Sequence, residues 1–371
     1  MDDLNWAARV AAIVDPGRFA ALLCDWCLEV VPGQQVLVES TSAAESLVSA
    51  MQQALLRRGA WPLLRMEPAS AAAGYLAAAQ AEQLDHPAPV ELIEAGHADA
   101  SLRIGAPLLA SPLAGVDPAL IVRRARGTAA VREARASRRW TLTLWPTPGL
   151  AQAAAMELDE YAAFVARALM LDREDPVRAW QELSDRQQLV VDRLTGARQI
   201  RIESDGTDLT LDVSGRTWIN SNGRRNMPSG EVFTSPLESS AEGKIRFDVP
   251  SNHGGSEVVN VDVCFSSGRV VSATAEQGDE ALQAALSTDH GARSLGELGI
   301  GTNTGIDRAT GSILLDEKIA GTIHLALGRS YPECGGLNES ALHWDLICDL
   351  RKGGRLTFDG EPLIVDGVMQ L

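Results

Sequence analysis

The stretch GTIHLALGRSYPECGGLNESALHWDL, residues 321–346, gathers side chains that could do chemistry: His324, Tyr331, His343 and Asp345. Imidazole nitrogens, a phenol and a carboxylate can ligate a divalent metal ion or transfer protons. A hydrophobic core has little use for such a set, whereas a metal site needs one. We therefore treat this stretch as part of a candidate metal site.

The spacing of His343 and Asp345 predicts that both side chains lie on one face of a strand. Side chains of a strand alternate between its two faces, so Leu342, Trp344 and Leu346 would point the other way. On a helix the two side chains would diverge by about 200°. The run TIHLALG, which holds the first histidine, predicts a second strand.

Two glutamates stand in surroundings that are unusual for a carboxylate. Glu231 follows a Pro-Ser-Gly turn, and Glu297 lies between Gly296 and Gly299 in the apolar run LGELGIG. A carboxylate buried among glycines and apolar residues is costly unless it is paired or binds a cation. With the histidines, the aspartate and the tyrosine, they make up the donors that a two-metal hydrolytic centre uses.

Each of these residues, taken alone, also fits a purely structural role, such as a hydrogen-bonded core histidine or a turn glutamate. The chain has no H-E-x-x-H motif, which excludes the common single-zinc helix site. The other histidines lie in polar or loop-like contexts, and we expect no metal role for them: His86, His97, His253 and His290.

Composition narrows the class of protein and its partners. The 371 residues, 45% of them hydrophobic, suffice for two domains, and the net charge of −16 argues against nucleic acid or an anionic membrane as partner. No apolar run reaches the roughly 18 residues of a membrane span, and the N-terminus does not resemble a secretory signal. The five scattered cysteines indicate reduced thiols, so we expect a cytoplasmic protein. We interpret Cys24 and Cys27 as core thiols, although they form a C-x-x-C.

The pattern of elements predicts an α/β fold in two parts. Residues 1–190 alternate helices with short apolar strands, which predicts a Rossmann-like layered α/β domain that ends in linking helices. No G-x-G-x-x-G follows any of these strands, so we expect no dinucleotide site. Residues 191–371 read as alternating strands with tight hairpins at 265–271 and 358–364, which predicts a strand-rich α+β domain. The candidate metal ligands all lie in this part, so we expect it to be the catalytic domain that binds metal.

Four segments closely resemble the thermophilic aminopeptidase family, the aminopeptidase T and aminopeptidase S type of metallopeptidase. They occur in the family's order and begin WTLTLWPTPG, GTDLTLDVSG, GARSLGELGI and DEKIAGTIHL, and the resemblance covers most of the chain from about Trp140 to the C-terminus. The resemblance is looser over the first 130 residues, where the chain is shorter than typical members. That departure concerns the region of substrate access and leaves the metal centre unaffected.

The resemblance implies a homodimeric exopeptidase that releases N-terminal residues from peptides and depends on two divalent ions per chain, zinc, cobalt or manganese. Position by position, it implies that the ions are bound by Glu231, Glu297, His324, His343 and Asp345. Tyr331 matches the family's active-site tyrosine, close to a metal.

The expected mechanism is attack by a water whose pKa two metal ions lower. We expect Glu297 to bridge the ions, and Glu231 or Glu297 to act as the general base. Tyr331 would donate a hydrogen bond to the oxyanion. The second metal, or an acidic group beside it, would bind the α-amine. Candidates for orienting the histidine rings are Asp316, Glu317 and Asp349.

Three other functions stay open from the sequence. Ring-cleaving dihydroxypyridine dioxygenases resemble the same family, and His324, His343 and Asp345 would satisfy their iron site, although iron would not need Glu231 and Glu297 as well. A specialised amide hydrolase would keep the metal pair but act on a narrow range of substrates. A peptide-binding protein without activity would have no reason to keep six costly polar groups at one site.

Overall fold

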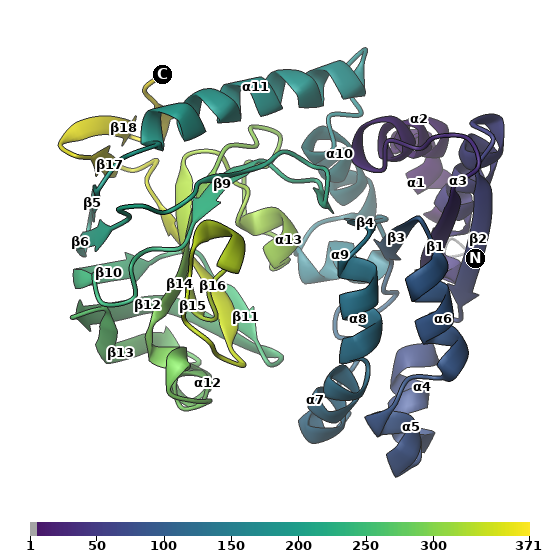
Figure 1. Cartoon of the computed structure of the whole chain (residues 1–371), viewed down its shortest axis with the longest axis horizontal. Coiled ribbons are helices and arrows are strands. Elements are labelled where there is room, and N and C mark those ends of the chain that lie inside the picture. Colours follow the sequence, from purple (N-terminus) through teal and green to yellow (C-terminus); the bar gives the residue numbers. More distant parts are fainter. Residues whose placement is uncertain (1–5) are drawn as a thin grey trace. The chain divides into compact units, whose positions relative to one another are not determined.

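The computed structural model describes residues 6–371, which form two compact units (Figure 1). Of the described residues, unit 1 contains 6–180 together with Gly223–Pro228, and unit 2 contains Gln181–Asn222 and Ser229–Leu371. The boundary expected near residue 190 stays a prediction, because compactness alone does not establish which residues fold independently.

Unit 1 is built on a parallel sheet of five strands. Their order is β2 (Trp61–Glu67), β1 (Gln35–Thr41), β3 (Ala100–Gly105), β4 (Arg139–Leu144) and β8 (Asn226–Met227). The first four strands lie where the apolar runs predict them. The last is a two-residue strand that the chain adds when it returns to unit 1, and the sequence pattern did not predict it.

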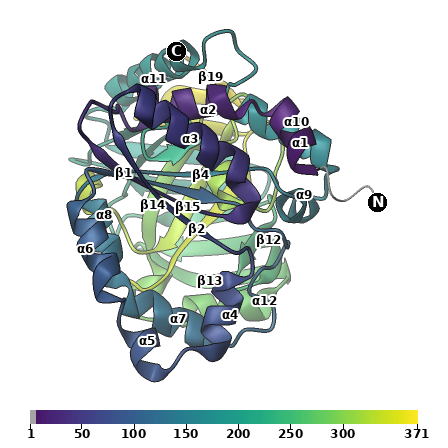
Figure 2. The same ribbon diagram turned by 90° about the vertical axis from the view of Figure 1, so that its right-hand side faces the viewer.

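Helices cover both faces of this sheet, as Figures 1 and 2 show. From β1 the chain steps outward to β2 through α3, and then crosses to β3 on the other side of β1. Right-handed crossovers in opposite directions place their helices on opposite faces. Accordingly α3 packs on one side, and α6 and α8 on the other. This arrangement is the predicted Rossmann-like layering.

The helices of unit 1 are α1 (Trp6–Ile13), α2 (Pro16–Leu22), α3 (Glu45–Arg57), α4 (Ala71–Ala78), α5 (Ala81–Asp85), α6 (Pro89–His97), α7 (Pro118–Gly127), α8 (Ala129–Ala136), α9 (Pro148–Ala153) and α10 (Leu158–Ala168). The next helix, α11 (Pro176–Leu194), begins in unit 1 and ends in unit 2.

Local details differ from the expected helices at two places. The pattern of residues 42–59 predicts a helix that Ser42 opens, but Ser42–Ala44 forms a 3₁₀ turn and α3 begins at Glu45. After α2 the chain widens into a π-helical segment, Leu23–Cys27, that buries both cysteines of the C-x-x-C. Both thiols lie in the core, so the interpretation as core thiols is confirmed. Burial raises the pKa of the Cys24 thiol to about 11.

Unit 2 contains two sheets. The larger runs β11 (Ser251–His253), β12 (Ser256–Ser266), β10 (Glu242–Phe247), β6 (Thr207–Asp212), β5 (Gln199–Ser204), β17 (Arg355–Phe358), β18 (Glu361–Val365) and β19 (Val368–Met369), with β13 (Arg269–Gln277) paired to β12. The smaller is antiparallel and runs β16 (His343–Asp349), β15 (Thr322–Gly328), β14 (Leu295–Gly301), β9 (Glu231–Thr234) and β7 (Ile219–Ser221). Two short helices, α12 (Asp279–Leu286) and α13 (Ile313–Asp316), connect strands.

A single hydrophobic cluster joins side chains from both sheets of unit 2. It includes Ile202 and Phe247 of the larger sheet, Leu298 and Leu325 of the smaller one, and Leu194 of α11. Both predicted hairpins are present, with two-residue turns at Ser267-Gly268 and Asp359-Gly360. All four turn residues have positive φ, as the right-handed twist of a hairpin favours.

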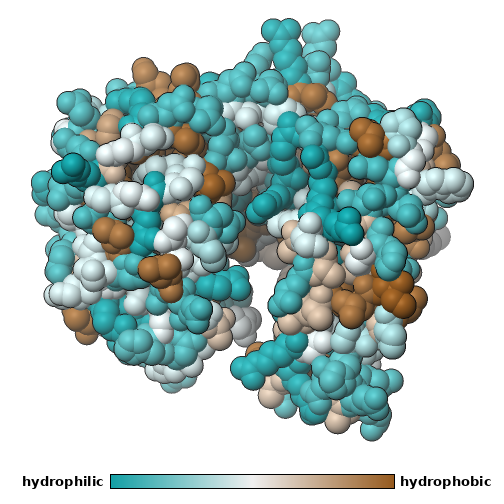
Figure 3. Space-filling view, in the orientation of Figure 1, coloured by the Kyte–Doolittle hydropathy of each residue, from teal (hydrophilic) through white to brown (hydrophobic). Residues whose placement is uncertain are grey.

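The surface agrees with the composition of the chain. The face in Figure 3 is mostly hydrophilic, with scattered hydrophobic side chains. Among the residues that the structure describes, no helix is both long and apolar enough to cross a membrane.

Candidate metal centre

Five of the six residues singled out in the sequence lie on the smaller sheet of unit 2. Glu231 is the first residue of β9, Glu297 lies in β14, His324 in β15, and His343 and Asp345 in β16. Four neighbouring strands thus contribute one donor or two each.

The register of the strands brings these side chains to the same face. Glu231 is opposite Gly301, His324 is opposite Gly299, and Asp345 is opposite Ala326. The residues that alternate with them lie in the hydrophobic cluster: Val232, Leu298, Ile300, Ile323, Leu325, Leu342, Trp344 and Leu346. The prediction that His343 and Asp345 share a face is therefore confirmed.

Gly299 is needed because of the ring that lies across it. A Cβ atom at this position would stand 2.1 Å from Nε2 of His324, far inside contact distance. Only glycine leaves room for the imidazole to lie over β14, toward Glu297. The glycine that looked like a simple neighbour of the glutamate in the sequence is thus part of the site.

Glu297 stands between the two histidines. Its Oε1 lies 3.6 Å from Nε2 of His324, and its Oε2 lies 3.3 Å from Nε2 of His343. Glu231 Oε2 approaches the same His324 nitrogen to 3.5 Å, and Asp345 Oδ2 approaches the His343 nitrogen to 3.6 Å. The donor atoms therefore converge and face one another.

Tyr331 joins this group from the segment after β15. Its hydroxyl lies 3.3 Å from Nε2 of His343, and its ring packs against Phe233 with centroids 5.3 Å apart. The backbone N–H of Tyr331 donates to Ser235 Oγ at 3.1 Å, which fixes the segment against the end of β9. All six predicted residues are thus close together.

Several buried atoms that could ligate a metal have no hydrogen-bond partner among the described residues: Glu231 Oε2, both ring nitrogens of His324, and Asp345 Oδ1. Buried polar atoms are almost always paired, and an unpaired one costs about 1–3 kcal/mol. Since these four atoms lie in one small region and are good metal ligands, the donor set fits bound cations.

The donors fall into three overlapping groups, in each of which the ligand atoms lie within 4.8 Å of one another. The first is Glu231, Glu297 and His324, and the second is Glu297, His343 and Asp345. The third combines Glu317 with His324 and Asp345. Glu297 belongs to the first two groups, so one carboxylate could serve two ions.

Sequence reasoning missed a lysine at the centre of this cluster. Lys318 is fully buried, and its Nζ lies 2.7 Å from Glu231 Oε1 and also contacts Glu317 Oε1. The signal was present, because DEK interrupts an otherwise apolar stretch six residues before His324. A buried lysine so close to ligand candidates indicates a site with excess negative charge.

None of the three candidates for orienting the histidine rings accepts a hydrogen bond from either ring. Asp316 accepts from Thr310 and Gly311, and Asp349 accepts from Arg351. The third candidate, Glu317, pairs with Lys318 as described above. Nδ1 of His343 bonds instead to the backbone carbonyl of Arg329 at 2.8 Å. If Nδ1 donates there, the ring presents its other nitrogen to Glu297 and Asp345.

The local charges move the pKa values of the site. Burial alone would raise the pKa of Glu297, but the histidines on either side lower it to about 2. Burial alone would lower the pKa of His324 and of His343, but the surrounding carboxylates raise both to about 9. Burial and the same carboxylates raise the pKa of Tyr331, so its phenol stays protonated at neutral pH.

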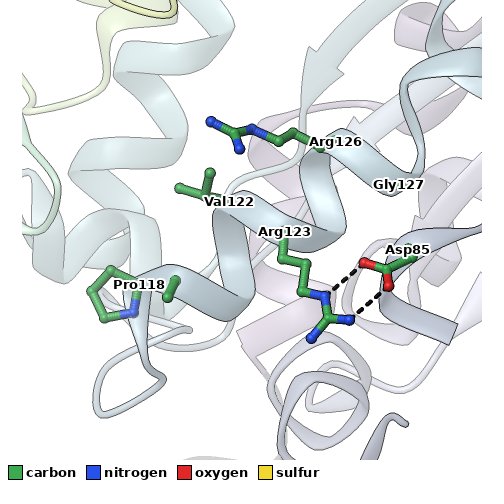
Figure 4. Close-up of a pocket in the computed structure, with 7 residues that line it drawn as sticks. Asp85, Pro118, Val122, Arg123, Arg126 and Gly127 are labelled. Atoms are coloured by element: carbon green, nitrogen blue, oxygen red, sulfur yellow. Dashed lines mark hydrogen bonds and ion pairs between the residues drawn. The ribbon is translucent and has the colours of Figure 1, made fainter. Parts of the chain in front are cut away.

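Two cavities differ in whether the candidate metal ligands line them. The wider one, about 660 Å³, lies in unit 1 beside α7, and Figure 4 shows Arg123 on its wall turned toward Asp85. Nε of Arg123 donates to Oδ1 of Asp85 at 2.6 Å. Its lining includes one carboxylate and no histidine or cysteine. A smaller cavity of about 200 Å³ lies in unit 2 and is lined by His343 and Asp345. The smaller cavity is therefore the one that leads to the candidate ligands.

We predict that the metal-free protein loses stability as the pH rises from about 6.5 to 9. The pKa of each site histidine in the fold is about 9, against 6.5 for an unperturbed imidazole. Their stabilisation is therefore complete below pH 6.5 and is lost as the pH passes through 9. The shift corresponds to about 3 kcal/mol per histidine. Urea unfolding in the presence of a chelator, at pH 6.5 and pH 9, measures the change.

The matched variants are His343→Gln and, as a control, His97→Gln on an exposed part of α6. The first should lose less stability over this pH range than the wild type, and the second should behave like the wild type. Equal losses in all three proteins would contradict the prediction.

Over part of its length the chain is similar to known aminopeptidases. Aminopeptidase 2 of Geobacillus stearothermophilus is 33% identical over 268 residues, which cover 62% of this chain and 64% of that protein. Aminopeptidase T of Thermus thermophilus is 31% identical over 261 residues, 62% of each chain. These alignments span less than two thirds of the relatives' own length.

The solved structure of wild-type AmpT from Thermus thermophilus covers 96% of this chain and 99% of its own, with a TM-score of 0.84 and 26% identity. This likeness confirms the predicted fold class. The family model described as thermophilic metalloprotease (M29) matches residues 16–367. The chain therefore belongs to the thermophilic metalloprotease (M29) family.

Proposed function

We propose that the protein is a metal-dependent aminopeptidase that releases N-terminal residues from peptides. The observation that carries the proposal is the pair of donor groups that share Glu297 and leave buried ligand atoms without partners. Relatives named aminopeptidase 2 and aminopeptidase T support the choice of peptide substrates with a free N-terminus. A homodimer in the cytoplasm belongs to the same proposal.

In this proposal two divalent ions per chain, zinc, cobalt or manganese, are held by Glu231, Glu297, His324, His343 and Asp345, with Tyr331 beside them. Glu297 would contribute to both sites, because it is the residue common to both groups. Bound ions would supply Lewis acidity and a lowered pKa for water. The histidines must be unprotonated to act as ligands. Their raised pKa values favour the protonated imidazoles, so metal binding must displace these protons.

The side chains have separate tasks in peptide hydrolysis. Glu231 or Glu297 takes the proton of the attacking water and passes it to the leaving amine. Tyr331, a neutral phenol, donates a hydrogen bond to the oxygen that gains charge as the carbonyl is attacked. The negative charge of the site attracts a cationic α-amine, which favours substrates with a free N-terminus.

A mononuclear iron dioxygenase is the weaker candidate. Its site would need His324, His343 and Asp345, but these do not form one of the three compact groups by themselves. Each of the first two groups includes Glu297, which such an iron site does not need. A narrow amide hydrolase would use the same ligands and would differ only in its substrate.

Metal content and peptidase activity test the proposal together. We expect about two divalent ions per chain by elemental analysis, and hydrolysis of leucine p-nitroanilide that a chelator abolishes and cobalt or zinc restores. The variants Glu231→Gln and Glu297→Gln distinguish a metal ligand from the general base. Loss of activity with the metal content unchanged indicates the base, whereas loss of metal indicates a ligand. A single iron per chain and no hydrolysis would overturn the proposal.

We predict that Tyr331→Phe lowers kcat by about 10²–10³-fold while the metal content is unchanged. The ring contact with Phe233 would remain, so the change removes only the hydroxyl. A loss of metal in this variant would make Tyr331 a ligand, and wild-type turnover would remove it from the mechanism.

The cavity beside β16 supports a preference among substrates. His343, Asp345 and Ile347 from one face of the strand line it, together with Ile313 and Asp316. Neither lysine nor arginine is among the residues that line it. An acidic side chain in this cavity would lie beside Asp316, which accepts only from neutral groups of Thr310 and Gly311, and it would find no lysine or arginine on the lining to pair with. We propose that the N-terminal residue of the substrate enters here.

We predict that kcat/KM for leucine p-nitroanilide exceeds that for the glutamyl analogue by about 100-fold or more. Ile313 is 44% exposed, so Ile313→Lys can be accommodated and would place a cation at the cavity. This variant should narrow the ratio about tenfold, whereas Ile313→Met should keep it. The same ratio in all three proteins would show that the side chain binds elsewhere.

A further inference from the structure

Lys318 has no task in the proposed reaction, yet it is among the largest fully buried side chains of the protein. It lies two residues beyond the end of α13, and its ammonium contacts two carboxylates, Glu231 and Glu317. Burying an ammonium is costly, and an ion pair with a good geometry only offsets that cost. Stability alone therefore gives a weak reason for a lysine here.

The three donor groups compete for shared ligands. Glu317 forms its group with His324, which the first group also needs, and with Asp345, which the second group also needs. A neutral imidazole has one unprotonated ring nitrogen, so His324 serves one group at a time. If Glu317 were available as a ligand, an ion in the third group would deprive the first group of His324 and would draw on Asp345, which the second group uses.

Lys318 acts on this competition through two contacts. Its contact with Glu317 Oε1 compensates that carboxylate, which is only 14% exposed. Its contact with Glu231 Oε1, at 2.7 Å, leaves the other oxygen of Glu231 without a hydrogen-bond partner and 3.5 Å from the His324 nitrogen. Glu231 thus presents one free oxygen, toward His324.

We propose that Lys318 is a positioning residue that determines which donor groups bind the metal ions. It does so by keeping Glu317 from acting as a ligand. The inference deepens the proposed metal centre, but it concerns metal binding, so its test does not depend on peptidase activity.

The test compares Lys318→Met, Glu317→Gln and the double variant with the wild type. Each protein is freed of metal and titrated with cobalt(II), and the visible absorption of the bound ion reports its ligands. In Lys318→Met, Glu317 is released and a positive charge is lost. We expect cobalt to bind at least as tightly as in the wild type, with a changed spectrum and a turnover about 10- to 100-fold lower.

The double variant Lys318→Met with Glu317→Gln removes the competing carboxylate as well. We expect it to recover the wild-type cobalt spectrum and stoichiometry, and Glu317→Gln alone to keep both. A general loss of structure would instead weaken cobalt binding in every Lys318 variant. If Lys318→Met does not fold, the double variant, which buries no unpaired carboxylate at position 317, decides the question.

Two results would overturn the inference. One is a wild-type cobalt spectrum in Lys318→Met, which would show that the lysine does not select ligands. The other is a double variant whose spectrum stays like that of Lys318→Met, which would show that Glu317 does not compete. Failure of the aminopeptidase proposal would appear separately, as cobalt-loaded wild-type protein without activity.

Discussion

The unit 2 site is organised around negative charge that the fold places out of water. Glu231, Glu297 and Asp345 are buried, and Glu317 is nearly so, while Lys318 supplies one compensating charge. One ammonium cannot neutralise four carboxylates, and a buried carboxylate without a partner costs several kcal/mol. In the metal-free protein the histidines take up part of this burden, which is why their pKa values rise. The same excess of charge makes the site suited to divalent cations.

An antiparallel sheet is an effective frame for such a site. Side chains on one face of neighbouring strands stand about 4.5–5.5 Å apart at Cβ, a separation that one cation can span with ligands from two strands. The opposite face is free to form the core, as Leu298, Leu325 and Leu346 do. A shift of β16 by one residue would move His343 and Asp345 into that core and Trp344 into the site. The hydrophobic face therefore fixes the register on which the ligand positions depend.

Part of this site can be predicted from sequence, because alternation along a strand is a local property. The pairing of His343 with Asp345 follows from their spacing, and the cost of burying Glu297 among glycines follows from its neighbours. Lys318 and Glu317 reach the site from the segment after α13, and nothing local indicates where that segment leads. The acceptor for His343 is the backbone carbonyl of Arg329, a group that every residue has, so no side chain could signal it. Similarly, β8 joins the parallel sheet through a long excursion of the chain that no local pattern records.

Unit 1 shows why the fold class does not by itself reveal a ligand site. In doubly wound sheets, ligands bind at the carboxyl ends of the strands where the strand order reverses, here between β1 and β3. In this chain the end of β1 is closed by its own bonds, because Ser40 Oγ donates to the Ile104 carbonyl at 3.0 Å and Thr41 Oγ1 to the Ala106 carbonyl at 2.9 Å. Glu39, on the same strand, is held by Arg135 at 2.7 Å. Without a glycine-rich turn to let a phosphate approach, these contacts tie the strands to each other, and the donors suited to chemistry gather in unit 2.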